Sequence, residues 1–242
     1  MSAHLADGLV RHEDGVVRCW WCGTDPLYVR YHDLEWGTPV TDEVRLFEKL
    51  SLEGFQAGLS WITILRKRER FREVFAGFRP EAVARFGARD VARLLRDPGI
   101  VRHRGKVTAV IENARRYEAL CAEFGSLAAF IWSFEPRGAR PAPTARQAIP
   151  AVVPASAAMS KALKVRGWRF VGPTTMYALF QAMGLVNDHL AGCRRRAEVD
   201  AVRASFMPPA VEGLGASAAA PPAQPGRSPS RAGPRVGARR PG

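Results

Sequence analysis

The sequence predicts an all-α fold, and three observations support this class. Apolar residues recur at helical spacing through most of residues 41–183, and residues suited to helix N-termini precede several of these segments. No segment alternates apolar and polar residues as a half-buried strand would. The 242 residues are 47% hydrophobic, which is enough for a sizeable core. We expect one domain over residues 18–207, after a loose leader over 1–17 and before a disordered tail over 208–242.

Local signals place the helices in order along the chain. Thr41 and Asp42 offer an N-cap to the first helix, Ser60 offers one to the second, and Pro80 suits the first turn of the third. Residues 18–40 show little helical pattern. After Met207 the chain is rich in Pro, Ala, Gly, Ser and Arg, a composition typical of disorder. The expected helices span residues 41–57, 60–76, 80–86, 90–95, 106–124, 126–134, 156–165 and 174–183, with a surface loop over 135–155.

The chain is strongly basic, with 36 Lys and Arg against 23 Asp and Glu and a net charge of +13. The predicted tail holds five arginines and one glutamate, so the rest of the chain keeps a net charge of +9. A basic domain favours a polyanionic partner, and nucleic acid is the leading candidate. The alternative is an arginine-rich composition without any such partner.

Cysteine use and hydropathy indicate a reduced, cytoplasmic protein without a membrane partner. Four scattered cysteines do not resemble a disulfide scaffold. Charged residues between Asp7 and Asp14 precede any apolar run, so no signal peptide is expected. No segment approaches the roughly 20 apolar residues of a membrane span.

The stretch from Leu52 to Trp61 places a carboxylate in apolar surroundings. Glu53 lies near the predicted end of a buried helix, and Gly58 suits the turn that follows. A buried carboxylate needs a partner or a functional role. The alternative to a functional role is that Glu53 caps a neighbouring helix or pairs with an arginine.

Aromatic residues are concentrated beside this carboxylate. Aromatic faces stack on nucleobases, at about 1–3 kcal/mol per base. Any one of these residues is more simply explained as part of the core, but the cluster beside Glu53 favours a pocket. The aromatic residues between positions 20 and 61 include Trp20, Trp21, Tyr28, Tyr31, Trp36 and Trp61.

Cys19, His32, His189 and Cys193 form a candidate metal site. His189 and Cys193 are four residues apart, which places them on one face of a helix. Two cysteines and two histidines are a tetrahedral zinc set that leaves no open position, so such a zinc would be structural. Cys22 could replace one ligand, because Cys19 and Cys22 also have a metal-ligand spacing. The alternative is free cysteines and surface histidines.

Two turns between helices are candidate DNA contacts. The turn from Pro98 to Lys106 carries Arg102, Arg104 and Lys106, and the turn from Phe170 to Thr175 contains Gly172 and Thr174. Backbone N–H groups at a helix start can hold a phosphate. Either segment could instead be only a tight turn.

Together these motifs resemble the bacterial 3-methyladenine DNA glycosylase I family over about residues 18–193. The resemblance implies a helix-hairpin-helix glycosylase fold, zinc at Cys19, His32, His189 and Cys193, and Cys22 outside that site. It also implies a base pocket of Glu53, Tyr31 and Trp61, with Trp21 and Tyr28 nearby. The motifs are Tyr28-x-x-Tyr31-His32-Asp33-x-Glu35-Trp36-Gly37, Leu52-Glu53-Gly54-x-Gln56-Ala57-Gly58-Leu59-Ser60-Trp61, Gly99-Ile100-x-Arg102-His103-Arg104-Gly105-Lys106, Phe170-Val171-Gly172-x-Thr174 and Val186-Asn187-Asp188-His189.

The implied activity is release of 3-methyladenine from alkylated double-stranded DNA by a monomeric enzyme. A cationic methylated base leaves as a neutral molecule, so binding through stacking and the Glu53 carboxylate can supply much of the catalysis. The turn at 170–175 has no lysine, which argues against a lyase step. Asn187 and Asp188 receive no catalytic role. The alternatives are a non-catalytic zinc-stabilised DNA-binding module, a zinc hydrolase, and a glycosylase for another lesion such as 3-methylguanine.

Overall fold

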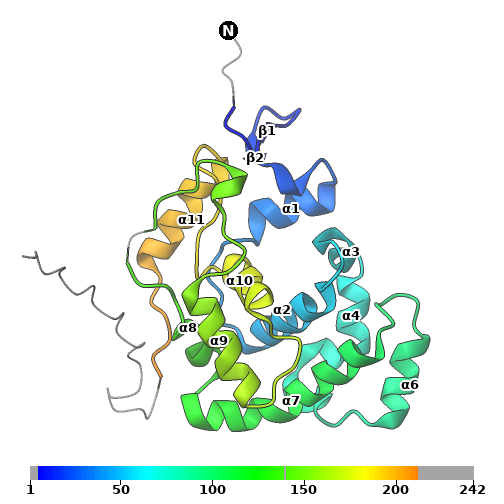
Figure 1. Cartoon of the computed structure of the whole chain (residues 1–242). Coiled ribbons are helices and arrows are strands. Elements are labelled where there is room, and N and C mark those ends of the chain that lie inside the picture. Colours follow the sequence, from blue (N-terminus) through cyan, green and yellow to red (C-terminus); the bar gives the residue numbers. More distant parts are fainter. Residues whose placement is uncertain (1–4, 139, 212–242) are drawn as a thin grey trace, which may run out of the picture.

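The computed structural model describes residues 5–138 and 140–211, and this part of the chain is mostly helical (Figure 1). A two-stranded antiparallel sheet, β1 (Leu9–Arg11) and β2 (Val17–Cys19), precedes the helices. Within the described residues, no helix has the length and apolar character needed to cross a membrane. The helices are α1 (Pro26–Leu34), α2 (Glu43–Gln56), α3 (Trp61–Leu65), α4 (Arg68–Val74), α5 (Pro80–Val83), α6 (Ala88–Arg96), α7 (Arg104–Phe124), α8 (Leu127–Trp132), α9 (Pro154–Val165), α10 (Pro173–Ala182) and α11 (Arg194–Ser205).

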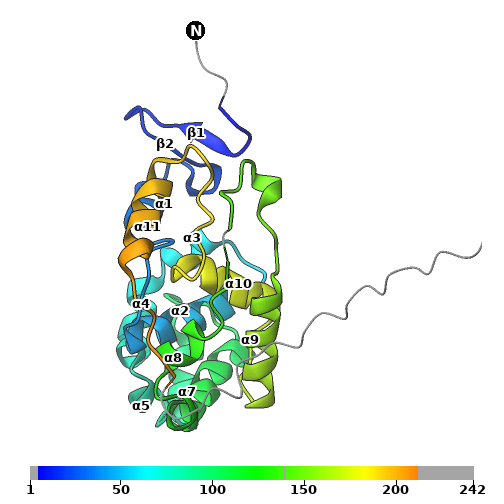
Figure 2. The same cartoon turned by 90° about the vertical axis from the view of Figure 1, so that its left-hand side faces the viewer.

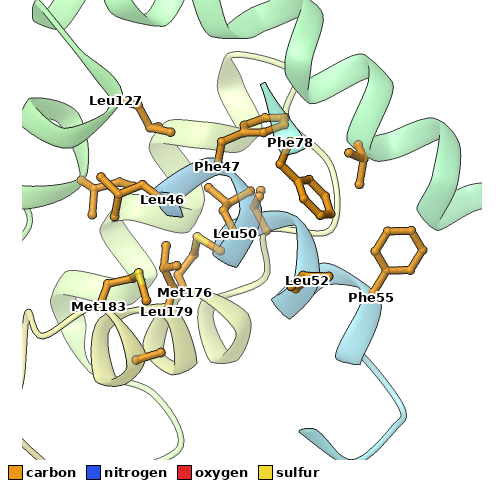
Figure 3. Close-up of a cluster of buried hydrophobic side chains, with 14 of the residues drawn as sticks. Leu46, Phe47, Leu50, Leu52, Phe55, Phe78, Leu127, Met176, Leu179 and Met183 are labelled. Atoms are coloured by element: carbon orange, nitrogen blue, oxygen red, sulfur yellow. The ribbon is translucent and has the colours of Figure 1, made fainter. Parts of the chain in front are cut away.

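Helices α2 and α10 lie at the centre, and the other helices surround them (Figures 1 and 2). Leu46 and Leu50 of α2 gather with Met176 and Leu179 of α10 in the core (Figure 3). All four side chains are almost fully buried. Full burial of such a side chain stabilises the fold by about 1.5–3 kcal/mol. The two central helices are therefore firmly anchored, and both contribute side chains to the cavity described below.

Both ends of α2 are held by polar contacts. Asp42 caps its first turn, because Asp42 Oδ1 accepts a hydrogen bond from the backbone N–H of Arg45 at 2.8 Å. At the other end, Lys106 Nζ donates to the carbonyl oxygens of Phe55 at 2.9 Å and Ala57 at 2.6 Å. A cation at a helix C-terminus satisfies free carbonyls and favours the helix dipole. These contacts fix the last turn of α2, which carries Glu53.

Most predicted helices are present with small shifts at their ends, but the helix expected over 60–76 is two helices. α3 ends at Leu65, and α4 begins at Arg68. The β-branched run Ile62-Thr63-Ile64 lowers the helix propensity of this segment. The prediction of one continuous helix was wrong here.

Three elements were missing from the prediction: the hairpin of β1 and β2, helix α1 and helix α11. The hairpin adds two short strands to a mostly helical fold and gives residues 9–17 a defined structure in place of a loose leader. Each strand has only three residues, too few to show an alternating pattern. Residues 208–211 are in neither helix nor strand, and the rest of the predicted tail, 212–242, lies outside the described residues.

Candidate functional site

A cavity of about 260 Å³ lies among α1, α2, α3 and α10. It contains all five side chains that were predicted to form the base pocket: Tyr31, Trp61, Trp21, Tyr28 and Glu53. Helix α10 adds two side chains that no sequence pattern had marked. The lining residues are Trp20, Trp21, Tyr28, Tyr31, Trp36, Lys49, Glu53, Gln56, Trp61, Ile149, Ala178 and Gln181.

Aromatic rings form a continuous wall in this cavity. The ring centres of Tyr31 and Trp61 are 5.4 Å apart, and those of Trp21 and Tyr28 are 5.2 Å apart. Trp21 also packs against Tyr31 at 6.3 Å, which joins the two pairs. Burial raises the pKa of Tyr28 to about 12, and burial and the Glu53 carboxylate raise that of Tyr31 as well. Both phenols therefore stay protonated and neutral at physiological pH.

Glu53 is buried in this wall, and its partner is Lys49 rather than an arginine. Lys49 Nζ lies 2.7 Å from Glu53 Oε1, and both side chains are less than one tenth exposed. The same Nζ donates to the hydroxyl of Tyr31 at 2.9 Å and lies 3.1 Å from the ring centre of Trp61. Burial lowers the pKa of Lys49, although Glu53 opposes that shift. Lys49 was not among the predicted site residues, yet its position four residues before Glu53 was a usable signal.

A second buried cluster brings together the four predicted metal ligands. The ligand atoms of Cys19, His32, His189 and Cys193 all lie within 4.8 Å of one another. Cys193 Sγ is 3.5 Å from His32 Nε2 and 3.6 Å from His189 Nδ1, and Cys19 Sγ is 3.8 Å from His189 Nδ1. The cluster joins β2 and α1 to the segment before α11, and it could hold a metal ion.

The surroundings of the two histidines orient their free nitrogens toward the cluster. His32 Nδ1 lies 2.8 Å from Asp33 Oδ1, and His189 Nε2 lies 3.1 Å from the carbonyl oxygen of Trp36. Both partners are acceptors, so these nitrogens carry the protons and leave His32 Nε2 and His189 Nδ1 as acceptors. Burial lowers the pKa of His189, which also favours the neutral ring. Metal ligands need this protonation state.

The two sulfurs of this cluster influence each other's ionisation. The neighbouring Cys19 and the two histidines lower the pKa of the Cys193 thiol, whereas the neighbouring Cys193 and burial raise that of Cys19. Cys22 is buried close by but outside the four-residue cluster, and its thiol donates to the carbonyl oxygen of Cys19 at 3.2 Å.

Asn187 and Asp188 make structural contacts. Asp188 is buried and accepts hydrogen bonds from Tyr177 and Gln181. Asn187 Nδ2 donates to Asp200 at 2.8 Å and to the carbonyl oxygen of Arg196 at 3.0 Å. Neither side chain lines the cavity. Gln181 connects the two regions, because it lines the cavity and donates to Asp188.

The two turns predicted to contact DNA lie side by side. The ring centres of His103 and Phe170 are 6.3 Å apart; α7 begins directly after His103, and α10 begins three residues after Phe170. Arg102 and Arg104 are exposed, and neither forms an ion pair within the described residues. Lys106 differs from them, because it is buried and its ammonium binds the end of α2.

The second turn is unusual in its backbone and close to the cavity. Phe170 has a φ of +56°, a left-handed backbone conformation that residues other than glycine rarely adopt. Gly172 is the N-cap of α10, and Thr174 in the first turn is exposed. A Cβ on Gly54 would lie 3.2 Å from Cβ of Phe170, so this turn packs against the residue that follows Glu53.

Comparison with known proteins relates this arrangement to one family. The family model described as methyladenine glycosylase matches residues 21–196. The chain is 51% identical over 179 residues to DNA-3-methyladenine glycosylase 1 of Escherichia coli (strain K12), which covers 73% of this chain and 95% of that protein. It is 47% identical over 181 residues to DNA-3-methyladenine glycosylase of Haemophilus influenzae (strain ATCC 51907 / DSM 11121 / KW20 / Rd). This match covers 73% of this chain and 96% of that protein.

A solved structure supports the same relationship. The crystal structure of a variant of 3-methyladenine DNA glycosylase I in complex with 3-methyladenine matches with a TM-score of 0.71 and 37% identity, covering 74% of this chain and 97% of that one. The glycosylase fold expected from the sequence motifs is thus confirmed, with the added hairpin at its start. The chain belongs to the methyladenine glycosylase family.

Proposed function

We propose that the protein is a monofunctional DNA repair glycosylase that releases 3-methyladenine from alkylated double-stranded DNA. The observation that carries this proposal is the buried carboxylate of Glu53 in a cavity walled by Tyr31, Trp61, Trp21 and Tyr28. The names of the relatives and the 3-methyladenine in one similar structure agree with it. We further propose that it acts as a monomer in the cytoplasm.

The pocket suits a base that carries a positive charge. Methylation at N3 makes adenine cationic while it is attached to deoxyribose, and the base departs neutral when the glycosidic bond breaks. A base rotated out of the duplex would stack on Tyr31 and Trp61, with Glu53 supplying negative charge. Ordinary adenine has the same ring without the charge, so electrostatic attraction distinguishes the two bases.

The paired turns would hold the DNA next to this pocket. Arg102 and Arg104 are exposed without ion pairs in the described residues, and the first turn of α10 offers backbone N–H groups near Gly172 and Thr174. Such groups bind phosphates and do not read bases. Lys106 would act indirectly, by holding the end of α2 beside the turn.

The four-residue cluster fits a structural zinc ion. Usual zinc bond lengths and tetrahedral angles separate a sulfur from a nitrogen ligand by about 3.5 Å, close to the 3.5–3.8 Å found here. Cys19, His32, His189 and Cys193 would fill the coordination shell. Zinc would then fasten the N-terminal segment to the segment before α11, and a zinc hydrolase would lack an open position.

A lyase step is not expected. Lys49 is the only lysine among the side chains that line the cavity, and its Nζ contacts Glu53, Tyr31 and the Trp61 ring. A Schiff base would need an amine that reaches C1′ of the sugar, whereas these contacts hold Nζ among the side chains that line the cavity. Borohydride treatment of the protein with abasic DNA should therefore trap no covalent complex, and a trapped complex that disappears in Lys49→Met would contradict the monofunctional proposal.

Base release from methylated DNA tests the proposed function directly. We expect chromatography of the released bases to show 3-methyladenine, and the same experiment reports whether 3-methylguanine is released. Binding to DNA without release of any base would favour the non-catalytic DNA-binding module. Product identification therefore separates the enzyme from the module and defines the lesion range.

A further inference from the structure

The ammonium of Lys49 occupies the features that would receive a cationic base. It lies 2.7 Å from Glu53 Oε1 and 3.1 Å from the ring centre of Trp61, and it donates to the Tyr31 hydroxyl at 2.9 Å. These contacts are the carboxylate, the π face and the hydroxyl on which recognition of a positive base depends. The pocket without a base thus already holds one positive charge of its own.

The other charged groups around Lys49 leave this charge balanced by Glu53 alone. Tyr31 of α1 stays neutral. Arg68 of α4 and Glu35, which follows α1, both face this region, but they pair with each other at 2.6 Å. A second cation entering the cavity would therefore meet an ion pair whose carboxylate is already in use, and the two positive charges would repel each other.

Lys49 is the group that can give up its charge. Burial lowers the pKa of its ammonium, whereas adenine methylated at N3 and bound to deoxyribose has no ring proton to lose. A neutral amine would keep N–H donors for Glu53 and Tyr31, and its lone pair could accept a hydrogen bond from the exocyclic amino group of the base. Loss of one proton from Lys49 thus removes the positive charge that competes with the incoming base beside Glu53 and Trp61.

We propose that Lys49 is a specificity-determining residue that releases one proton when a cationic base enters the pocket. This inference rests on the proposed function. The Lys49 N–H bond breaks, the proton passes to solvent, Glu53 stays ionised, and the base brings the positive charge that Lys49 gives up. A neutral base requires no such exchange, so the two classes of base should differ in how their binding depends on pH.

Calorimetric titration with two small probes tests this exchange. The permanent cation 3,9-dimethyladeninium has no glycosidic bond to break, and 9-methyladenine is its neutral counterpart. Titrations in buffers of different ionisation enthalpy should show about one proton released by the wild type with the cation and none with the neutral base. Affinity for the cation should rise about tenfold per pH unit while Lys49 is charged in the free protein.

Lys49→Met is the informative variant, because it keeps an unbranched side chain only one heavy atom shorter and removes its charge. We expect it to lose the proton release and the pH dependence of the wild type, and its thermal unfolding should be measured beside them, because the change leaves the buried Glu53 carboxylate without its cation. Lys161→Met, which alters an exposed lysine of α9, should behave as the wild type. If Lys49→Met does not fold, the proton count of the wild type decides alone.

The inference is overturned if the wild type binds the cation without releasing a proton, or if Lys49→Met keeps the proton release and pH dependence of the wild type. Failure of the proposed function would appear elsewhere, as an absence of base release from methylated DNA by the wild type. The two failures are therefore distinguishable.

Discussion

The Cys/His cluster and the proposed base pocket are both buried groups of polar side chains to which α1 contributes, yet one is closed and the other contains a cavity. In the cluster, four ligand atoms lie within 4.8 Å of one another, and the outer nitrogens of both histidines are held. In the pocket, about 260 Å³ remains among the side chains. Buried polar groups that satisfy one another suit a structural role, whereas buried polar groups beside a cavity suit binding.

Two tryptophans connect these regions. Trp21 lies 5.1 Å from the ring of His32 and 6.3 Å from the ring of Tyr31, between the cluster and the pocket. Trp36 lies 4.7 Å from His189 and also lines the cavity. A change in the cluster would therefore disturb the pocket wall, and the two roles are best separated by measuring stability and base release on the same variants.

The largest expected effect is the loss of metal and stability when the Cys/His cluster is changed. Cys193→Ser removes one ligand of the proposed zinc site, so we expect loss of bound metal and a fall in unfolding free energy of about 3 kcal/mol or more. Elemental analysis and thermal unfolding would measure both. Cys22→Ser is the matched control, because Cys22 is buried nearby but outside the cluster, and it should keep its metal. A metal-free protein with full stability would contradict the proposal that zinc fastens the N-terminal segment to the segment before α11.

Glu53→Gln tests the proposed base pocket. The variant must be designed with Lys49 in mind, because Lys49 pairs with Glu53. In the wild type this change leaves a buried lysine without its partner, which can cost several kcal/mol of stability by itself. In a Lys49→Met background no cation is left unpaired. There we expect Glu53→Gln to lower base release about 100-fold, with metal content unchanged. Unchanged release in that background would mean that Glu53 is only structural.

Trp61→Leu should have a smaller effect on the same pocket. The substitution keeps an apolar side chain but removes the π face, so base affinity should fall by about 1–3 kcal/mol. Affinity for 9-methyladenine in a Lys49→Met background measures this loss, because no ammonium then lies over the ring. An unchanged affinity would show that the base does not stack on Trp61.

Helical periodicity predicted the central helices but not the elements that flank the two polar regions. The apolar faces of α2 and α10 pack into the core, which produces a clear pattern in sequence. Helix α1 has Asp25 and Pro26 at its start, both usable signals, but it contributes polar and aromatic side chains to the cluster and pocket in place of an apolar face. Periodicity cannot identify a helix whose buried face is not apolar.

The candidate site was predictable where its residues are close in sequence or carry a distinctive motif. Glu53 and the aromatic residues lie within 42 positions, from 20 to 61. Gln181 could not be found, because only the packing of α10 on α2 brings it to the cavity. Lys49 was overlooked because a lysine in a helix is usually solvent-exposed, although its spacing from Glu53 placed both on one face.

The smallest expected effect concerns the surface that would bind DNA. Arg104 is exposed at the start of α7 and has no ion pair within the described residues. Arg104→Ala should weaken binding to any duplex and reduce the slope of log affinity against log salt by about one contact. Arg11→Ala is the control, because Arg11 is also exposed but lies in β1, at the other end of the molecule from α6 and α7 (Figure 1). A loss confined to one DNA sequence would indicate that Arg104 reads bases, and equal losses in both variants would indicate general charge attraction instead of a phosphate site.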